Sequence, residues 1–393
     1  MELKELQTPC YIIRAGEYEK NMADFRGAFT SRWGENIRLG YSVKTNNFPW
    51  LLKTAMEKGY CAEVVSPDEY AFVLRCGCPE EKIIFNGPQK QERLLGACRA
   101  GATVNLDNME EVETVCAAFG GGSIQPVLGL RVNFDLEAIC PGETTCTGVP
   151  GRFGLCLENG DFSLALEKLR TAGLKVSGLH LHQSSKSRST AIFSAVARTA
   201  AAIGREFGLR ELAYVDVGGG FFGGSFFPGK PSFDEYAETV CNILREVYDP
   251  GITTLLLEPG AAILATAMDY LCSVLNIREV RGERIVTLDG SLLHINPMMN
   301  PHPTPFTMLN PGVESDAPQI IAGSTCMEMD RFWPRDMRNL AVHGSQFLFH
   351  ACGAYMSTHN SSFINAAPNI YLERGGDYTL LREKSIDALF GKE

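Results

Sequence analysis

One unit recurs through about two thirds of this chain: a short apolar or β-branched run, a turn, and then an amphipathic stretch at helical spacing. Strands are expected at eight places, over residues 37–43, 60–65, 82–85, 103–106, 126–132, 176–182, 214–217 and 253–257. Helices are expected between them, over residues 50–58, 67–75, 91–99, 110–119, 163–171, 191–207 and 233–248. Alternating strands and helices indicate parallel βαβ units, and eight units in about 220–250 residues fit a closed (β/α)8 barrel. A doubly wound open sheet is the structural alternative.

The pattern changes after Gly260, where short strand-like runs are separated by Gly, Pro and Asn turns. Strands are expected over residues 270–277, 284–288, 319–322, 339–342, 346–349, 369–371 and 378–381, and no long helix before the C-terminal tail. This texture is typical of an all-β domain, a β-barrel or β-sandwich. We therefore predict an α/β barrel domain over residues 9–265 and a β domain over residues 266–393 that includes residues 1–8.

Composition narrows the classes of partner. The 46 acidic residues outnumber the 36 Lys and Arg residues, and this negative balance argues against a nucleic-acid partner. No apolar run approaches the ~20 residues of a membrane span, and the first residues lack the apolar core of a signal peptide, so a cytoplasmic protein without a membrane partner is expected. Thirteen cysteines without a Cys-x-x-Cys pair indicate reduced thiols rather than a disulfide scaffold or a structural zinc site.

Residues that could take part in chemistry lie at the ends of the expected strands or just after them, which is where functional groups gather in a (β/α)8 barrel. They are Lys44, Glu63, Asn86, Asp107, Arg131, His180, His182, Gly218, Gly219, Gly220 and Glu258. Lys44 could supply an amine for a Schiff base, or it could be a surface lysine that caps a loop. The glycine triplet would let backbone N–H groups approach a phosphate, or it could be only a tight turn.

His180 and His182 are two residues apart, so both side chains lie on one face of a strand. This spacing also occurs in metal-dependent barrel hydrolases, which need further ligands nearby. The chain has seven histidines and the other five follow residue 265, so no metal site is expected. One imidazole could instead stack on an aromatic cofactor, with the other buried in the core.

A series of motifs resembles the fold-type III pyridoxal-phosphate decarboxylases, the group that includes diaminopimelate, ornithine and carboxynorspermidine decarboxylases. The motifs cover nearly the whole chain in order: Thr8-Pro9-Cys10-Tyr11, Tyr41-Ser42-Val43-Lys44-Thr45-Asn46, Glu63-Val64-Val65-Ser66, Arg152-Phe153-Gly154, Gly178-Leu179-His180-Leu181-His182, Asp216-Val217-Gly218-Gly219-Gly220-Phe221, Glu258-Pro259-Gly260, Gly323-Ser324-Thr325-Cys326 with Asp330, and Gly353-Ala354-Tyr355. The resemblance implies an alanine racemase-like barrel with a C-terminal β domain, and pyridoxal 5'-phosphate as cofactor.

The resemblance also implies roles for individual residues. Lys44 would carry the cofactor as an internal aldimine, with Glu63 near the lysine and ring and His182 stacked on the ring face. The other cofactor-binding positions would be Ser185, the amides of Gly218, Gly219 and Gly220, Gly260 and Tyr355. Cys326 would protonate Cα after carbon dioxide leaves, reaching the partner's barrel in a homodimer with shared active sites.

Glu258 favours decarboxylation. A carboxylate beside the pyridine nitrogen keeps it protonated, so the ring can stabilise the carbanion as a quinonoid. Racemases of the same fold place an arginine there. The alternatives are such a racemase, a metal-dependent barrel hydrolase, and a regulatory protein that binds the cofactor without catalysis.

Three departures from the family pattern bear on the substrate. Ala261 stands where an arginine binds phosphate, and Met327 stands where an acidic residue holds the substrate's distal ammonium, with Glu328 following it. Asn296 lies in the stretch where an Arg-Pro pair or an aspartate is expected. An asparagine cannot replace the bidentate grip of an arginine on a carboxylate. The sequence therefore argues against diaminopimelate and free ornithine, and favours a larger or differently charged small-molecule substrate, such as a carboxylated polyamine or a conjugate from siderophore or antibiotic synthesis.

Overall fold

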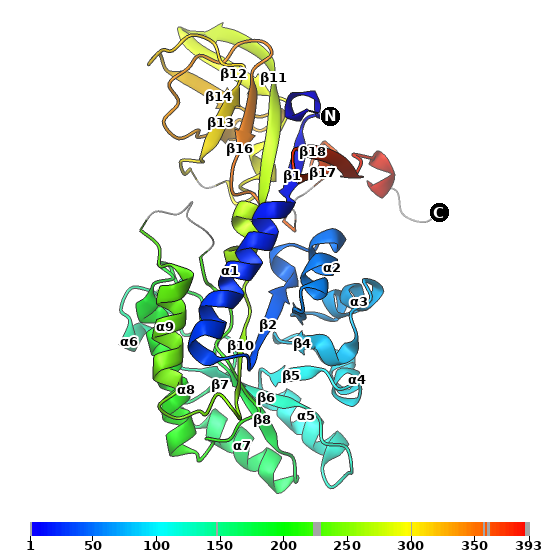
Figure 1. Ribbon diagram of the computed structural model, residues 1–393, viewed down its shortest axis with the longest axis vertical. Helices are drawn as coiled ribbons and strands as arrows, with labels where there is room; N and C mark the ends of the chain where they lie inside the picture. Colours follow the sequence, from blue (N-terminus) through cyan, green and yellow to red (C-terminus); the bar gives the residue numbers. More distant parts are fainter. Residues whose placement is uncertain are drawn as a thin grey trace. The chain divides into compact units, whose positions relative to one another are not determined.

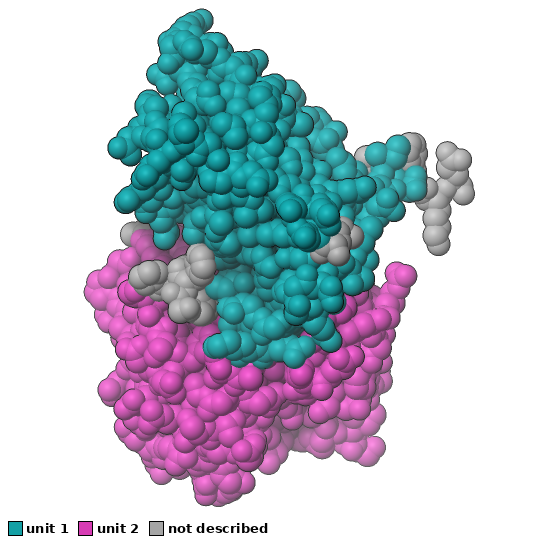
Figure 2. All heavy atoms as spheres, turned by 45° about the horizontal axis from the view of Figure 1, so that its top comes forward, with its two compact units in different colours: residues 1–21, 263–393 teal, residues 22–262 magenta. Residues whose placement is uncertain are grey.

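The computed structural model describes residues 2–146, 148–222, 229–299, 301–356, 358–359 and 362–389. The chain divides into two compact units, residues 1–21 with 263–393 (unit 1) and residues 22–262 (unit 2), which Figure 2 colours separately. Among the described residues, no helix is long and apolar enough to cross a membrane. The thirteen cysteines are all free thiols.

Unit 2 is a closed parallel barrel. Its strands are β2 (Ile37–Ser42), β3 (Cys61–Val64), β4 (Ile83–Phe85), β5 (Thr103–Leu106), β6 (Leu128–Asn133), β8 (Val176–His180), β9 (Tyr214–Asp216) and β10 (Thr254–Leu257). They are ordered β5-β4-β3-β2-β10-β9-β8-β6, and a parallel pairing of β5 with β6 closes the ring. The predicted barrel is confirmed, and the open-sheet alternative is wrong. A short extra strand, β7 (Leu155–Cys156), pairs with β6 and is too short to leave a pattern in the sequence.

Helices surround these strands (Figure 1). They are α2 (Pro49–Glu57), α3 (Pro67–Arg75), α4 (Leu94–Arg99), α5 (Met109–Phe119), α6 (Leu136–Ile139), α7 (Asp161–Thr171), α8 (Thr190–Glu206) and α9 (Phe233–Leu244). Local sequence fixes several of their starts. The Ser66 side chain accepts a hydrogen bond from the Glu69 N–H at the start of α3, and Ser232 forms a capping box with Glu235 at the start of α9. The barrel interior is filled by a buried cluster of Cys61, Ile84, Tyr214 and Leu256.

Unit 1 contains one large sheet. Its strands are β1 (Cys10–Arg14), β11 (Met268–Val280), β12 (Glu283–Leu288), β13 (Phe306–Leu309), β14 (Gln319–Ala322), β15 (Arg331–Phe332), β16 (Gln346–Phe349), β17 (Asn369–Arg374) and β18 (Asp377–Arg382). The order is β15-β14-β12-β11-β1-β17-β18, and β16 joins β13 to β11. The expected second domain of β structure is confirmed.

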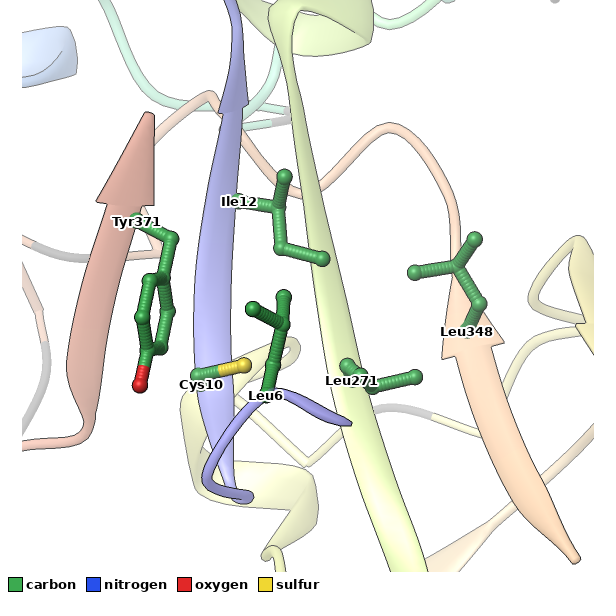
Figure 3. Close-up of a cluster of buried hydrophobic side chains, with 6 residues drawn as sticks. All are labelled: Leu6, Cys10, Ile12, Leu271, Leu348 and Tyr371. Atoms are coloured by element: carbon green, nitrogen blue, oxygen red, sulfur yellow. The ribbon is translucent and has the colours of Figure 1, made fainter. Parts of the chain in front are cut away.

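Strand β1 lies inside this sheet, antiparallel to β11 and parallel to β17. Figure 3 shows the buried cluster around it, in which Cys10 and Ile12 of β1 lie beside Leu271, Leu348 and Tyr371. These main-chain and side-chain contacts place the start of the chain in unit 1 as far as Asn21. The expected boundary at residue 9 differs from this division for that reason.

Three features depart from the strand and helix predictions. Helix α1 (Ala15–Trp33) and strands β1, β13 and β15 are additional elements. Residues 339–342 form no strand, because their main-chain pairing with residues 312–315 is short, with an isolated bridge between Asn339 and Glu314. The described part of the C-terminal tail contains a short 3-10 helix, Ile386–Leu389.

Candidate active site

Lys44 and Glu63 form an ion pair at the C-terminal ends of neighbouring strands. Lys44 follows β2 in a short 3-10 turn, and Glu63 on β3 is the register partner of Ser42. The Lys44 Nζ donates to Glu63 Oε2 at 2.5 Å. The lysine side chain is 37% exposed and the glutamate only 1%, so a buried carboxylate holds an amine that other molecules can reach.

Glu258 follows β10 and lies close to this pair. Its Oε1 accepts a hydrogen bond from the Asn86 Nδ2 at 2.5 Å, and the same Nδ2 donates to Glu63 Oε1 at 3.1 Å. On its other side, Glu258 Oε2 lies 3.7 Å from His180 Nε2. The barrel thus brings together three of the side chains predicted from the sequence, Lys44, Glu63 and Glu258.

A buried acid pair sets the charge of Glu258. Burial, followed by the charge of Glu258, raises the pKa of Asp216 well above its ordinary value. Burial alone would raise the pKa of Glu258 as well, but His180, Lys44 and a hydrogen bond with Asp216 outweigh it and lower that pKa. These opposite shifts favour a proton on Asp216 and a negative charge on Glu258.

His182 is a neutral imidazole of known orientation. Burial is the main cause that lowers its pKa to about 3, and the Arg131 cation adds to the effect. Its Nδ1 accepts the Gly219 N–H at 3.1 Å, so the proton of the neutral ring is on Nε2. Gly218 packs so closely that a Cβ there would lie 2.5 Å from the His182 Cβ, and its φ of +71° also favours glycine. The rings of His180 and His182 are nearly parallel, with centroids 6.4 Å apart.

The glycine triplet has fewer unpaired amides than its sequence suggests. The Gly218 N–H donates to Asp216 Oδ1 at 2.8 Å, and the Gly219 N–H is taken by His182. Within the described part of the chain, nothing accepts the Gly220 N–H, and a Cβ added to Gly220 would meet open space. Of the three predicted phosphate amides, Gly220 is thus the one that no described residue occupies.

Two other predicted cofactor positions lie in unit 2. Ser185 is in the β8–α8 connection and forms an isolated bridge with Thr144. Gly260 packs against Thr45, where an added Cβ would overlap the threonine hydroxyl. Gly260 therefore keeps the backbone close to the turn that carries Lys44.

The remaining predicted residues lie in unit 1. Cys326 is exposed, in the loop between β14 and β15. The buried Asp330 organises this loop, accepting hydrogen bonds from the Thr325 N–H at 3.1 Å, the Thr325 hydroxyl at 2.7 Å and the Leu292 N–H at 2.7 Å. Asp330 thereby joins the cysteine loop to the turn that precedes Asn296.

The predicted substrate positions are of two kinds. Asn296 is buried, and its Nδ2 lies 3.2 Å from His302 Nδ1. Met327 follows Cys326, and the Glu328 side chain is 96% exposed, 3.6 Å from Arg331. Tyr355, the predicted phosphate ligand of unit 1, is partly exposed and has a φ of +66°. The two groups of predicted residues, those of unit 1 and those of unit 2, are each assembled within their own unit.

The sequence indicated no role for two residues of the site, Asn86 and Asp216. Asn86 stands among the strand-end residues, but only the structure shows that it touches both glutamates. Asp216 belongs to the motif before the glycine triplet, and its contact with Glu258 depends on the β9–β10 pairing.

His180, Asp216 and Glu258 also have ligand atoms within 4.8 Å of one another, as a metal site would require. Both His180 nitrogens and Asp216 Oδ2 are buried without a hydrogen-bond partner in the described part of the chain. A site without metal stays our prediction.

The barrel places an amine, an imidazole and a buried carboxylate at the ends of its strands. Enzymes that bind an aldehyde cofactor through a lysine use this set of groups. Residues 16–265 match the family model described as "Pyridoxal-dependent decarboxylase, pyridoxal binding domain". The chain belongs to this family of pyridoxal-phosphate-dependent amino-acid decarboxylases.

Relatives resemble the chain over almost its full length. A probable chloroplastic diaminopimelate decarboxylase of Oryza sativa is 27% identical over 96% of this chain and 77% of its own length. The L-glutamyl-[BtrI acyl-carrier protein] decarboxylase of Niallia circulans is 26% identical over 97% of this chain and 92% of its own. The crystal structure of M. jannaschii diaminopimelate decarboxylase with L-lysine has the same fold, with a TM-score of 0.82 and 24% identity over 97% of this chain and 90% of that one.

The residues of the barrel fit pyridoxal phosphate, the cofactor of this family. The cofactor needs an amine for its aldehyde, an acceptor for its protonated ring nitrogen and donors for its phosphate. Lys44 offers a partly exposed amine, Glu258 a buried ionised carboxylate, and Gly220 an N–H without a partner among the described residues. The barrel thus contains each of the three types of group that the cofactor requires: an amine, an acceptor and a donor.

Proposed function

We propose that Lys44 binds the cofactor's aldehyde covalently and that Glu258 faces its ring nitrogen. His182, neutral and fixed by Gly219, would stack on the ring, and the phosphate would lie at Gly220 and Ser185. The polar contacts of Lys44, Glu258 and His182 within unit 2 support these assignments. Tyr355 of unit 1 would complete the phosphate site.

Bound there, pyridoxal phosphate supplies an electron sink for the electron pair left when the bond between Cα and the carboxylate breaks. Glu258 contributes a fixed negative charge that keeps the ring nitrogen protonated. Glu63 orients the Lys44 amine by accepting its hydrogen bond. Cys326 would deliver the proton to the substrate's Cα.

For the substrate, we propose an amino acid carried in a conjugate. The observation that carries this proposal is the residue at position 296: it is a buried asparagine directed to His302, with no guanidinium for a second free carboxylate. Met327 likewise offers no charge for a distal ammonium. The Niallia circulans relative, whose printed name gives a carrier-protein-bound glutamyl group, supports this class of substrate. A carboxylated polyamine is the second candidate, because the exposed Glu328 could bind an amine.

Carbon dioxide release over a matched series of substrates tests this proposal. The series comprises diaminopimelate, ornithine, lysine, free glutamate, carboxyspermidine and glutamate linked through its γ-carboxyl to a pantetheine thiol. We expect kcat/KM for the pantetheine conjugate to exceed that for free glutamate by at least about tenfold, since a free second carboxylate would be buried without a partner. Turnover of diaminopimelate or ornithine as fast as the conjugate would contradict our interpretation of Asn296 and Met327.

Replacing Cys326 by alanine tests the proton donor. We expect kcat to fall by about 10²-fold, because the general acid is lost, and part of the product to leave as an aldehyde when the proton goes to another carbon. Product analysis by mass spectrometry measures this ratio. Cys146→Ala is the matched control, since Cys146 is also an exposed free thiol.

We further propose a cytoplasmic homodimer in which Cys326 serves the partner's barrel. The free thiols support a reducing compartment. Mixing the Cys326→Ala and Lys44→Ala proteins distinguishes shared from separate sites. With shared sites, random re-pairing should restore about one quarter of wild-type activity, because half of the dimers contain one intact site. No recovery after verified subunit exchange would argue that each chain uses its own cysteine.

A further inference from the structure

Asn86 lies at a junction that neither the motifs nor the proposed roles explain. It follows β4, is 2% exposed, and its backbone N–H donates to the Val64 carbonyl at 2.8 Å, which fixes it beside the end of β3. Its side-chain amide donates to Glu63 Oε1 and to Glu258 Oε1. One neutral side chain thus bridges two buried carboxylates of the site.

Two further residues continue the hydrogen bonds of this amide. Asn86 Oδ1 accepts the Asn105 Nδ2 at 2.8 Å, and Asn105 Oδ1 accepts the Tyr214 hydroxyl at 2.7 Å. A tyrosine hydroxyl can donate or accept, so the direction is set at the other end: the carboxylate oxygens accept, which turns Asn86 Nδ2 toward them and Asn86 Oδ1 toward Asn105. Tyr214, Asn105 and Asn86 thus form a row of donors that ends at the carboxylates of Glu63 and Glu258. All four hydrogen bonds of this row are buried.

Two barrel strands leave space for this row. Gly178 on β8 lies against the Tyr214 ring, and Gly129 on β6 lies against both the Tyr214 hydroxyl and Asn105 Oδ1. At either position an added Cβ would overlap these atoms. Side chains that would normally fill a barrel interior are thus missing at the points where Tyr214 and Asn105 pass.

We propose that Asn86 is a positioning residue that holds the Glu63 and Glu258 carboxyl groups side by side by donating to both, with its amide held in place by Asn105 and Tyr214. This inference rests on the proposed roles of Lys44 and Glu258 for its catalytic meaning, but not for its test. Gly40 of β2 lies between the two glutamate side chains, so their approach is a feature of the barrel wall itself.

The physical need for such a residue follows from the charges. Two buried carboxylates at one site repel each other, and without donors one of them takes up a proton. A protonated Glu258 could not hold a positive ring nitrogen. The other titratable or charged groups that face the row are Lys44, Glu69, His180, His182, Asp216 and, beside Tyr214, Arg38.

Asn86→Leu in the cofactor-free protein is the direct test, because leucine has a similar size and no donor. Infrared spectroscopy across pH measures the protonated carboxyl groups. We expect one more protonated carboxyl at neutral pH than in the wild type, and an upward shift of its titration midpoint by at least about one pH unit, which equals tenfold in the protonation equilibrium. The matched control is Asn36→Leu. Asn36 also donates through Nδ2, to the Pro250 carbonyl at 2.8 Å, and lies just before β2, at the opposite end of the barrel strands.

Two further measurements complete the test. Asn86→Ser keeps one donor and covers the case in which the leucine variant does not fold; its midpoint should shift in the same direction by a smaller amount. In the loaded enzyme, kcat should fall about 10- to 100-fold, with the acidic limb of the kcat–pH profile moved upward, because the carboxylate is then lost as the pH falls through a higher pKa. Unchanged carboxyl titration in both variants would overturn the proposal. A failure of the proposed function would appear elsewhere, as full activity in Lys44→Ala.

Discussion

Replacing Lys44 by alanine is expected to remove the visible absorption, and so the yellow colour, that a Schiff base between a lysine and pyridoxal phosphate would give the enzyme, and to lower the rate of carbon dioxide release by about 10³-fold or more. The Lys44 amine is the reachable partner of the buried Glu63, and alanine removes the group that would bind the cofactor's aldehyde. Absorption spectroscopy and a carbon dioxide assay measure the two effects. The substitution also removes the ion-pair partner of Glu63, so the stability of the folded variant should be measured as a function of pH.

Lys82→Ala provides the control for this substitution, because Lys82 is an exposed lysine at the other end of a barrel strand, just before β4. It should keep both colour and activity. Borohydride reduction followed by peptide mapping gives an independent readout, since it fixes the bound aldehyde on the lysine that holds it. A label on any lysine other than Lys44 would show that Lys44 does not bind the cofactor's aldehyde.

Glu258→Gln should lower kcat by about 10²- to 10³-fold with little change in cofactor binding, the usual effect of removing one preorganised charge from a site. Glutamine has the size of glutamate and keeps an oxygen for Asn86, so the hydrogen bond at Oε1 can persist. The other oxygen becomes an NH2 group, so the negative charge is lost together with the oxygen that faces His180 Nε2. The change also relieves Asp216 of a like charge, so the pKa of Asp216 should fall from its raised value.

Steady-state kinetics and cofactor titration separate these effects. Glu246→Gln is a suitable control, because Glu246, just after α9, forms an exposed ion pair with Arg205 of α8 and is not one of the site residues. A kcat for Glu258→Gln within about threefold of the wild type would show that this carboxylate does not stabilise charge in the reaction.

The barrel could be predicted because its strands are short apolar runs that alternate with helices, several of which have a side-chain cap at their start. Thr103–Leu106 and Pro67–Arg75 occur in the structure with the predicted bounds. Helix α1 carried a usable signal as well, since Tyr18, Met22, Phe25, Phe29 and Trp33 are all buried at helical spacing. It was missed because it precedes the first repeated unit.

Contacts between distant strands account for what the sequence could not predict. Asn86 and Glu258 are 172 residues apart, and nothing near either residue indicates that they touch. The glycine triplet shows a related limit: its motif indicates backbone amides, but only the fold shows that Asp216 and His182 occupy two of them. Residues 339–342 have a strand-like composition, yet their main-chain pairing with residues 312–315 is too short to form a strand.

The position of β1 has a consequence for how the chain matures on the ribosome. Cys10 pairs with Leu271 on one side and with Asn369 on the other. At about 5–20 residues per second, the second of these neighbours emerges roughly 20–70 seconds after the first strand. The barrel segments are synthesised in that interval, and one edge of β1 stays unpaired until β17 has emerged. A nascent chain released before β17 would therefore expose an unpaired edge of β1.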